Sequence, residues 1–258
     1  MQRSFRHKVI IRALGPQAIS VTDLARLTGC SAVTIRRDLA ELERQGGLKR
    51  VHGGAVAVGP RGTPMPYSLR AAERAAEKGA IARVVAQIVQ DDTSVILDNG
   101  STLVAVAEEL AGRPVTALCL SLRAASALGP AGSVNGSPVT AIATPRGVVE
   151  GDGQRYGGAA CLEALDAFRA DVAVIGACSA SPAHGLSVTT SEDARVKRAI
   201  ITSSVQVVLA ATGDKLSRTS SFRFGDLEDI DHLVTTVDVS DSVVEDVRAA
   251  GVAIHIAE

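Results

Sequence analysis

The stretch SVTDLARLTGCSAVTIRRDLAELERQG, residues 20–46, decides the fold of the N-terminal part of this 258-residue chain. Ser20, followed three residues later by Asp23, predicts a capping box at the start of a short helix. Gly29 ends that helix, because glycine tolerates the left-handed backbone that helix ends require. The apolar stripe of this first helix is predicted to be Val21, Leu24, Ala25 and Leu27.

Ser31 is placed to cap a second helix, in which Ile35, Leu39 and Leu42 recur at helical spacing and face a core. Two helices joined by a tight turn are typical of a helix-turn-helix, whose second helix enters the major groove of DNA. Arg36 and Arg37 lie away from the apolar stripe, as do Val33 and Thr34. An arginine there can bridge guanine O6 and N7 or bind phosphate, whereas the alternative for the pair alone is an ordinary solvated face.

The segment after this helix predicts a β-hairpin wing, with two short strands on either side of a His52-Gly53-Gly54 turn. Its basic side chains can reach phosphate or the minor groove, although His52 alone could equally be a turn residue without contacts. The residues predicted to bind DNA are Ser31, Thr34, Arg36, Arg37, Lys49, Arg50 and His52.

TIRRDL, the helix-ending glycine and RVHGGA follow one another here as they do in the DeoR family of bacterial transcriptional regulators. Residues 3–58 resemble the winged helix-turn-helix of that family, and a looser likeness continues through most of the remaining chain. The resemblance implies a duplex DNA operator as partner. It also implies a C-terminal sensor domain similar in fold to ribose-5-phosphate isomerase and CoA transferases, which commonly binds a phosphorylated sugar or related metabolite.

Composition and charge agree with a DNA-binding domain attached to a larger globular domain. The chain is 46% hydrophobic but only 2% aromatic, which argues against a single-strand binder built on stacked aromatics. Residues 1–58 carry ten Lys and Arg against four Asp and Glu, a net +6, while the remainder carries net −7. A basic N-terminal part on an acidic body favours duplex binding by the N-terminal part.

The four cysteines form no Cys-x-x-Cys pair and no metal-like cluster with histidine, so we expect reduced thiols and no metal or cofactor. No apolar signal peptide opens the chain, and no run approaches the ~18 apolar residues of a membrane span. The sequence therefore predicts a soluble cytoplasmic protein.

Three parts are expected: a DNA-binding domain over residues 1–58, a linker and connecting helix over 59–92, and a sensing and oligomerisation domain over 93–258. The Pro- and Gly-rich run GPRGTPMPY marks the linker. A long Ala-rich helix, about 69–90, follows it and either joins the domains or packs against a partner subunit.

From Thr93 onward, short apolar runs alternate with helical segments, which predicts a mostly parallel sheet covered on both faces. The predicted strands are 94–98, 115–120, 139–143, 171–177, 206–211, 232–236 and 252–256. The predicted helices are 101–110, 122–128, 157–168, 192–203 and 242–249.

Ligands of such sheets bind beyond the carboxyl ends of the strands. Three stretches are expected there, residues 98–102, 144–147 and 212–215. The first joins a strand to a helix and suits a phosphate, although a plain turn capped by Ser101 is the alternative. Lys215 could meet an anion or lie on the surface. The residues predicted to bind an effector are Asp98, Asn99, Gly100, Ser101, Thr102, Arg146 and Lys215.

The family resemblance supports these stretches unevenly. The usual Leu-Asp-Ser-Gly-Thr-Thr loop is closely followed by residues 97–102, and Lys215 matches the family lysine although Thr212 stands where aspartate is usual. Residues 119–121 replace a usual Thr-Asn-Ser, and residues 144–145 replace Gly-Gly. Two of the four stretches expected to line the effector pocket thus differ from the family pattern.

We therefore expect a sequence-specific regulator, a repressor of carbohydrate or related metabolism that forms a dimer or tetramer and is controlled by a phosphorylated metabolite. The alternative is an isomerase-like enzyme that uses Asp98 or Lys215 as acid and base. The sequence shows no second carboxylate placed by a motif, no nucleophile elbow and no metal cluster, which argues against catalysis.

Overall fold

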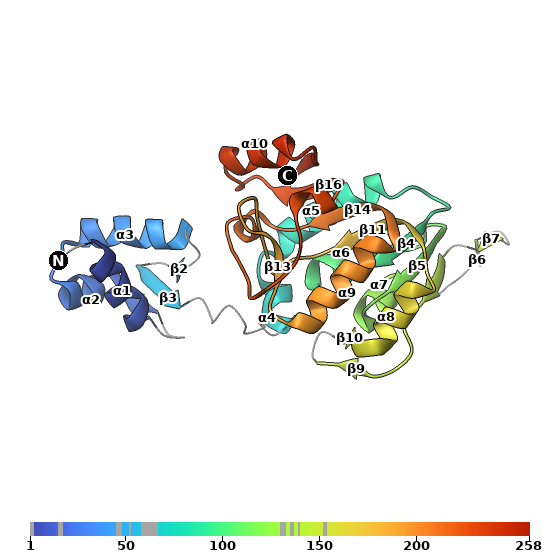
Figure 1. Ribbon diagram of the computed structural model, residues 1–258, viewed down its shortest axis with the longest axis horizontal. Helices are drawn as coiled ribbons and strands as arrows, with labels where there is room; N and C mark the ends of the chain where they lie inside the picture. The colour runs from blue at the N-terminus through green and yellow to red at the C-terminus, as the bar shows by residue number, and fades with distance from the viewer. Residues whose placement is uncertain are drawn as a thin grey trace. The chain divides into compact units, whose positions relative to one another are not determined.

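The computed structural model describes residues 3–14, 18–44, 48–51, 53–57, 67–129, 133–134, 137–138, 140–151 and 154–258. The chain forms two compact units, divided after residue 63 (Figure 1). Most of the predicted linker lies outside the described residues. Within the described part, no helix is both long enough and apolar enough to cross a membrane.

The N-terminal unit is a winged helix-turn-helix. Its helices are α1 (Arg3–Ala13), α2 (Val21–Thr28) and α3 (Ala32–Arg44), and its strands are β1 (Ile19–Ser20), β2 (Leu48–Val51) and β3 (Gly54–Ala57). The predicted hairpin wing, β2 and β3, is confirmed, and β1 adds an unpredicted third strand in the order β1-β3-β2. Gly54 permits this pairing, because a Cβ there would lie 2.1 Å from the carbonyl oxygen of Ile19.

The predicted helix signals of this unit are confirmed, with two corrections. The Ser20 hydroxyl accepts a hydrogen bond from the Asp23 amide at 3.0 Å, and Gly29 ends α2 at φ 66°. The second half of the predicted capping box is wrong, because the Asp23 carboxylate accepts from the Ser20 hydroxyl at 2.7 Å instead of from the Ser20 amide. Leu27 was assigned to the apolar stripe but is 55% exposed. Leu24 and Thr28, four residues apart, form the buried face of α2, and Leu27 is turned away from it.

A seven-stranded, all-parallel sheet forms the C-terminal unit, in the order β17-β16-β14-β11-β4-β5-β8. Every strand predicted for this sheet is confirmed. The strands are β4 (Ser94–Leu97), β5 (Val115–Cys119), β8 (Thr140–Ala143), β11 (Ala170–Ile175), β14 (Ser204–Ala210), β16 (His232–Thr236) and β17 (Ala253–Ala257).

Helices cover both faces of this sheet. Side chains of α5 (Ala75–Ile88), α6 (Ser101–Glu109) and α7 (Leu122–Ala127) share one buried cluster with the sheet. The other face packs against α8 (Gly158–Asp166), α9 (Ser191–Thr202) and α10 (Asp241–Ala249), with α8 and α9 on the viewer's side in Figure 1. Burial on both faces explains why the strands are almost continuously apolar.

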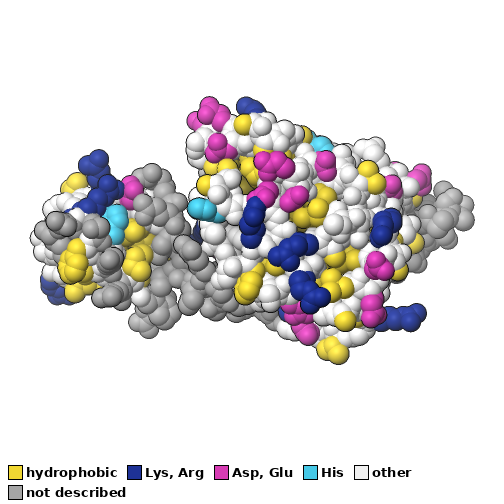
Figure 2. All heavy atoms as spheres, in the orientation of Figure 1, with side chains coloured by type: hydrophobic (Ala, Val, Ile, Leu, Met, Phe, Trp, Pro, Cys, Tyr) yellow, Lys and Arg dark blue, Asp and Glu magenta, His cyan; other side chains and the backbone are white. Residues whose placement is uncertain are grey.

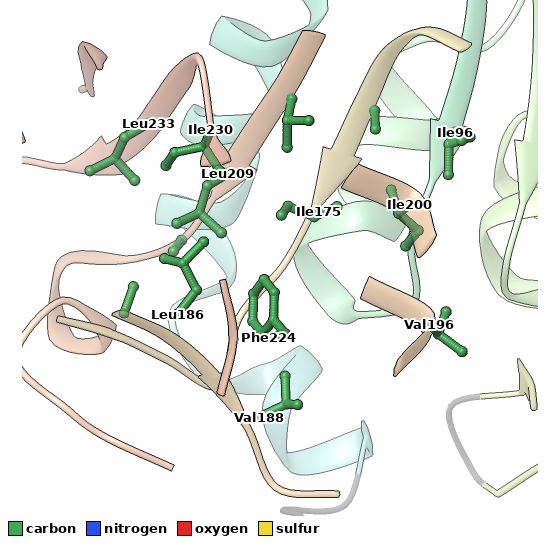
Figure 3. Close-up of a cluster of buried hydrophobic side chains, with 14 of the residues drawn as sticks. Ile96, Ile175, Leu186, Val188, Val196, Ile200, Leu209, Phe224, Ile230 and Leu233 are labelled. Atoms are coloured by element: carbon green, nitrogen blue, oxygen red, sulfur yellow. The ribbon is translucent and has the colours of Figure 1, made fainter. Parts of the chain in front are cut away.

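Several short strands were not predicted. The strands β12 (Ser179–Ser181), β13 (Gly185–Val188) and β15 (Phe222–Gly225) form a small antiparallel sheet, and Phe224 of β15 packs into the core drawn in Figure 3. Two two-stranded ribbons complete the unit, β6 (Ser133–Val134) with β7 (Ser137–Pro138) and β9 (Val149–Glu150) with β10 (Arg155–Tyr156).

The predicted connecting helix over 69–90 is wrong in one respect, because the structure breaks it into α4 (Tyr67–Ala72) and α5. The break falls at Glu73 and Arg74, and Arg74 adopts the left-handed conformation with φ 57°. The apolar positions of α5, including the fully buried Ile81 and Val85, pack against α6 and the sheet. They are therefore filled within the unit rather than by a partner subunit.

Candidate DNA-binding surface and effector site

Asp38 fixes the orientation of α3 in the N-terminal unit. It is 4% exposed, accepts a hydrogen bond from Arg6 Nη2 at 3.1 Å, and lies 3.1 Å from His7 Nε2. Burial opposes the charge of this carboxylate, but hydrogen bonds from Arg6 and His7 lower its pKa. Asp38 thus ties α3 to α1, and sequence reasoning missed it although it belongs to the TIRRDL motif.

With Asp38 turned inward, the opposite side of α3 faces solvent. Arg36 and Arg37 are exposed there, and Val33 beside them is 72% exposed. Figure 2 shows Lys and Arg side chains over α3. Ser31 caps the helix by accepting from the Thr34 amide at 3.2 Å, and the two hydroxyls hydrogen-bond at 2.9 Å.

The wing adds positive charge beside this helix. Lys49 and Arg50 are exposed on β2, and the Arg50 amide donates to Glu43 Oε1 of α3 at 2.9 Å. This bond joins the wing to α3. His52, also predicted to contact DNA, lies outside the described residues.

In the C-terminal unit, Asp98 directly follows β4 and is fully buried. Its Oδ2 accepts from the Gly176 amide at 3.1 Å and pairs with the ammonium of Lys197, which α9 supplies and which is 2% exposed. Asn99 donates to the other carboxylate oxygen at 3.2 Å and to Asp193 at 3.3 Å. Both oxygens of Asp98 are therefore used inside the protein, where they fix the loop to α9.

Each charge of the Asp98–Lys197 pair is stabilised by the other, because both groups are buried. Burial raises the pKa of Asp98, although Lys197 acts in the opposite direction. Burial also opposes the charge of Lys197, but Asp193 and Asp98 together raise its pKa. Sequence reasoning missed Lys197. One signal existed, since Lys197 stands three residues from the buried Ala194 and Ile200, on the inner face of α9.

Gly100 and Ser101 start α6 in an unexpected way. Gly100 is the N-cap with φ 144°, a conformation that favours glycine, and no side chain caps the helix. The alternative of a turn capped by Ser101 is wrong, because the Ser101 hydroxyl donates to the carbonyl of Arg70 at 3.3 Å instead. Amide groups at the start of α6, which includes Thr102, thus lack a side-chain acceptor and suit an anion.

Lys215 lies in a single 3-10 turn, η1 (Gly213–Lys215), directly after β14. Its ammonium is 3.4 Å from Asp214, which also meets Arg218 at 3.0 Å. Lys78 of α5 stands one helical turn after Arg74, which donates to the same Asp214 at 2.9 Å. Burial and the positive charges of Lys215 and Arg70 lower the pKa of Lys78. The structure thus adds Lys78 to the site, a residue that sequence reasoning overlooked although it shares a helical stripe with the buried Ala82 and Val85.

Two of the predicted effector residues, Ser101 and Lys215, are linked through the segment at Arg70 and Arg74. Ser101 and Lys78 both donate to the Arg70 carbonyl oxygen, and Arg74 donates to Asp214, which lies 3.4 Å from the Lys215 ammonium. Arg146 is not part of this chain of contacts. It is exposed after the edge strand β8, which β5 separates from β4.

All four cysteines are free, as expected: Cys30, Cys119, Cys161 and Cys178. Cys119 and Cys161 are buried, and burial raises the pKa of each thiol to about 12, so both stay protonated at neutral pH. No cluster of three metal-ligating side chains occurs among the residues that the structure describes.

Two family models match the chain, the DeoR-like helix-turn-helix domain over residues 6–61 and the DeoR C terminal sensor domain over residues 73–237. The chain belongs to the DeoR family. The DeoR regulator is therefore a DNA-binding protein with a sensor domain, and the predictions of a transcriptional regulator and of a non-enzyme are confirmed.

Relatives of this DeoR regulator cover nearly its whole length. The HTH-type transcriptional repressor GlcR of Bacillus subtilis is 31% identical over 84% of this chain and 81% of its own. The glycerol-3-phosphate regulon repressor of Haemophilus influenzae is 30% identical over 95% and 93%. Among solved structures, ribose 5-phosphate isomerase A of Methanocaldococcus jannaschii has a TM-score of 0.38 at 17% identity, covering 54% of this chain and 53% of that chain. The sorbitol operon regulator SorC of Klebsiella pneumoniae has 0.38 at 13%, covering 89% and 94%.

Proposed function

We propose that this DeoR regulator is an operator-specific repressor of genes for carbohydrate or related metabolism, released from DNA by a small phosphorylated metabolite. Two relatives with repressor names, GlcR and the glycerol-3-phosphate regulon repressor, support the biological role. The contacts around the uncapped start of α6 carry the choice of an anionic effector, because Ser101 and Lys78 share the Arg70 carbonyl, and Arg74 and Lys215 share Asp214. Two ammonium groups and free helix amides favour a phosphate group.

Arg36 and Arg37 are proposed to read base edges, while Lys49 and Arg50 of the wing contact phosphates. A good bidentate arginine contact contributes about 1–3 kcal/mol of discrimination between bases. Arg37→Ala should therefore weaken binding to the selected operator about 5- to 150-fold, and binding to random duplex much less. The operator is first selected from genomic fragments, and Arg83→Ala, an exposed arginine of α5, is the matched control. Equal losses on operator and random duplex would show that Arg37 contacts only phosphate.

The effector site is tested by thermal shift with a panel of sugars and the same sugars phosphorylated, because a ligand that binds the folded protein raises its melting temperature. We expect phosphorylated members alone to stabilise the wild type. Lys78→Met and Lys215→Met should each abolish the shift, while Arg83→Ala retains it. Stabilisation by the unphosphorylated sugars to the same degree would contradict an anion site.

The isomerase alternative finds little support in this geometry. Its acid/base candidate Asp98 is fully buried with both oxygens occupied, so it has no access to a substrate proton. Turnover of a sugar phosphate that is lost in Lys215→Met would reverse this choice.

We also propose that the regulator acts in the cytoplasm as a dimer or tetramer. It should then prefer repeated half-sites about 34–36 Å apart, or a multiple of that spacing. Light scattering gives the mass in solution. Protection of an isolated half-site at full affinity would contradict the oligomeric arrangement.

A further inference from the structure

The six-residue helix α4 is the first described element of the sensor unit, and side chains from three other helices hold it. Ser101 of α6 donates to its Arg70 carbonyl at 3.3 Å. Lys78 of α5 donates to the same carbonyl and, at 2.6 Å, to that of Glu73. The guanidinium of Arg123, from α7, lies 4.6 Å from the ring centre of Tyr67. So short a helix is not stable alone, and these contacts decide whether it forms.

Arg74, the N-cap of α5, connects α4 to α5 in a strained backbone conformation. Its φ of 57° is costly for a residue with a side chain, so the surroundings must hold it. They do so through carboxylates: Arg74 donates to Glu77 and Asp214 at 2.9 Å and to Asp238 at 2.6 Å. Burial opposes the charges of Asp214 and Asp238, but their hydrogen-bonding and cationic neighbours lower the pKa of both.

The same cluster contains part of the effector site. Asp214 also faces Lys215, the residue following it, at 3.4 Å. A change around Lys215 therefore reaches Arg74 through one shared carboxylate. Gly213 allows η1 to approach Asp238 closely, because a Cβ there would lie 2.5 Å from Asp238 Oδ1.

Lys78 belongs to the proposed anion site and also holds α4 in place. Its ammonium has three donors, and two of the acceptors are the carbonyls of Arg70, in α4, and of Glu73, the residue that follows α4. Lys215 and Arg70 crowd it with like charge and help to lower its pKa. An anion between Lys78 and Lys215 would relieve this repulsion and attract the same N–H groups away from the carbonyls.

We propose that residues 67–74, which we call the clasp, are the two-state element through which an anion bound at Lys78 and Lys215 controls the DNA-binding unit. With the site empty, Lys78 and the Arg74 cluster hold the clasp closed. Anion binding withdraws Lys78, and the clasp loosens at the point where the chain enters from residues 58–66. This inference rests on the proposed function, because it uses the same anion site. The anion can act only to the extent that it binds the loosened state more tightly.

Amide hydrogen exchange of the full-length protein tests the structural step, with inorganic phosphate as the probe. We expect phosphate to slow exchange at the start of α6 and to speed it over 67–74. Slower exchange at α6 with no change over 67–74 would overturn the clasp and leave the anion site standing. No change in either segment would overturn the anion site and the clasp together.

The functional step is tested with Arg74→Ala and with Arg83→Ala as the matched control from α5. In the wild type and in Arg83→Ala, phosphate should weaken operator binding by a factor in the usual coupling range of about 5–150. Arg74→Ala should still be stabilised by phosphate, because Lys78 and Lys215 remain, but the factor should fall toward one. Arg74→Lys keeps the positive charge but lacks the planar guanidinium, so its phosphate factor should lie between those of the wild type and Arg74→Ala. This variant keeps the test decisive if Arg74→Ala folds poorly. A full phosphate effect in both Arg74 variants would overturn the proposal.

Discussion

Lys197→Met should destabilise the C-terminal unit strongly, because it leaves the carboxylate of Asp98 buried without a counter-charge. Both side chains are almost fully enclosed, with exposures of 3% for Lys197 and 0% for Asp98. Removing one partner of such a pair costs about 3–5 kcal/mol of unfolding free energy. Methionine keeps most of the volume of lysine, so the loss reports the charge rather than a cavity.

The direction in which the stability deficit of Lys197→Met changes with pH distinguishes the loss of a counter-charge from a simple repacking of side chains. Burial raises the pKa of Asp98, and without Lys197 it should rise further. A carboxyl whose folded pKa lies above its unfolded pKa binds a proton in the folded state, so stability grows as the pH falls. Between the folded pKa of Asp98 in the wild type and its higher folded pKa in the variant, each pH unit returns about 1.4 kcal/mol, so the deficit of Lys197→Met should shrink from pH 8 to pH 5.

Urea unfolding of the full-length protein, followed through the transition of the C-terminal unit, measures these free energies. The double variant Asp98→Asn/Lys197→Met removes both charges and should recover most of the loss at either pH. A loss below about 0.5 kcal/mol in Lys197→Met, the range of ordinary surface substitutions, would refute the reasoning. So would a deficit that stays constant from pH 8 to pH 5.

Three further outcomes are expected. Asp38→Ala should lower the melting temperature of the N-terminal unit by about 4–8 °C at pH 7. Because the pKa of Asp38 is lowered, its stabilisation is present above pH 3.8 and is lost as the pH falls through the folded pKa, below which the melting curves of the two proteins should converge. Gly100→Ala forces a side chain into a backbone region reserved for glycine and within 3.2 Å of Leu103, and should cost about 1–3 kcal/mol in urea unfolding while weakening phosphate binding. Lys49→Ala should weaken operator and random duplex alike and reduce the slope of log affinity against log salt by about one; an unchanged slope would remove Lys49 from the phosphate contacts.

The sheet could be predicted strand by strand because each parallel strand is buried on both faces and is therefore a continuous apolar run. The strands of the small antiparallel sheet, such as Ser179–Ser181, escaped prediction because they are short and carry serine. The break at Arg74 escaped for a different reason. No Gly or Pro marks it, and two of the three carboxylates that hold the left-handed Arg74, Asp214 and Asp238, are distant in the sequence.

The candidate site was predicted where function coincides with a local pattern. A strand end, a glycine and two hydroxyl residues identify the loop at 98–102 from neighbouring positions alone. Lys197 contacts Asp98 from 99 residues away, and no local pattern records that pairing. Lys78 likewise resembles an ordinary helix lysine until the fold brings its ammonium to the carbonyls of Arg70 and Glu73.

The narrow gap between Gly54 and Ile19 has a consequence for how the N-terminal unit can adapt to its target. Ser20 pairs with Gly54 in the sheet and at the same time caps α2, and the Val21 amide donates to the Gly53 carbonyl at 2.9 Å. The hairpin and the helical pair therefore move as a single rigid piece. We expect such a piece to adapt little when the helix and the wing meet an operator of different groove spacing, so that bending of the DNA supplies the tolerance for operator variants.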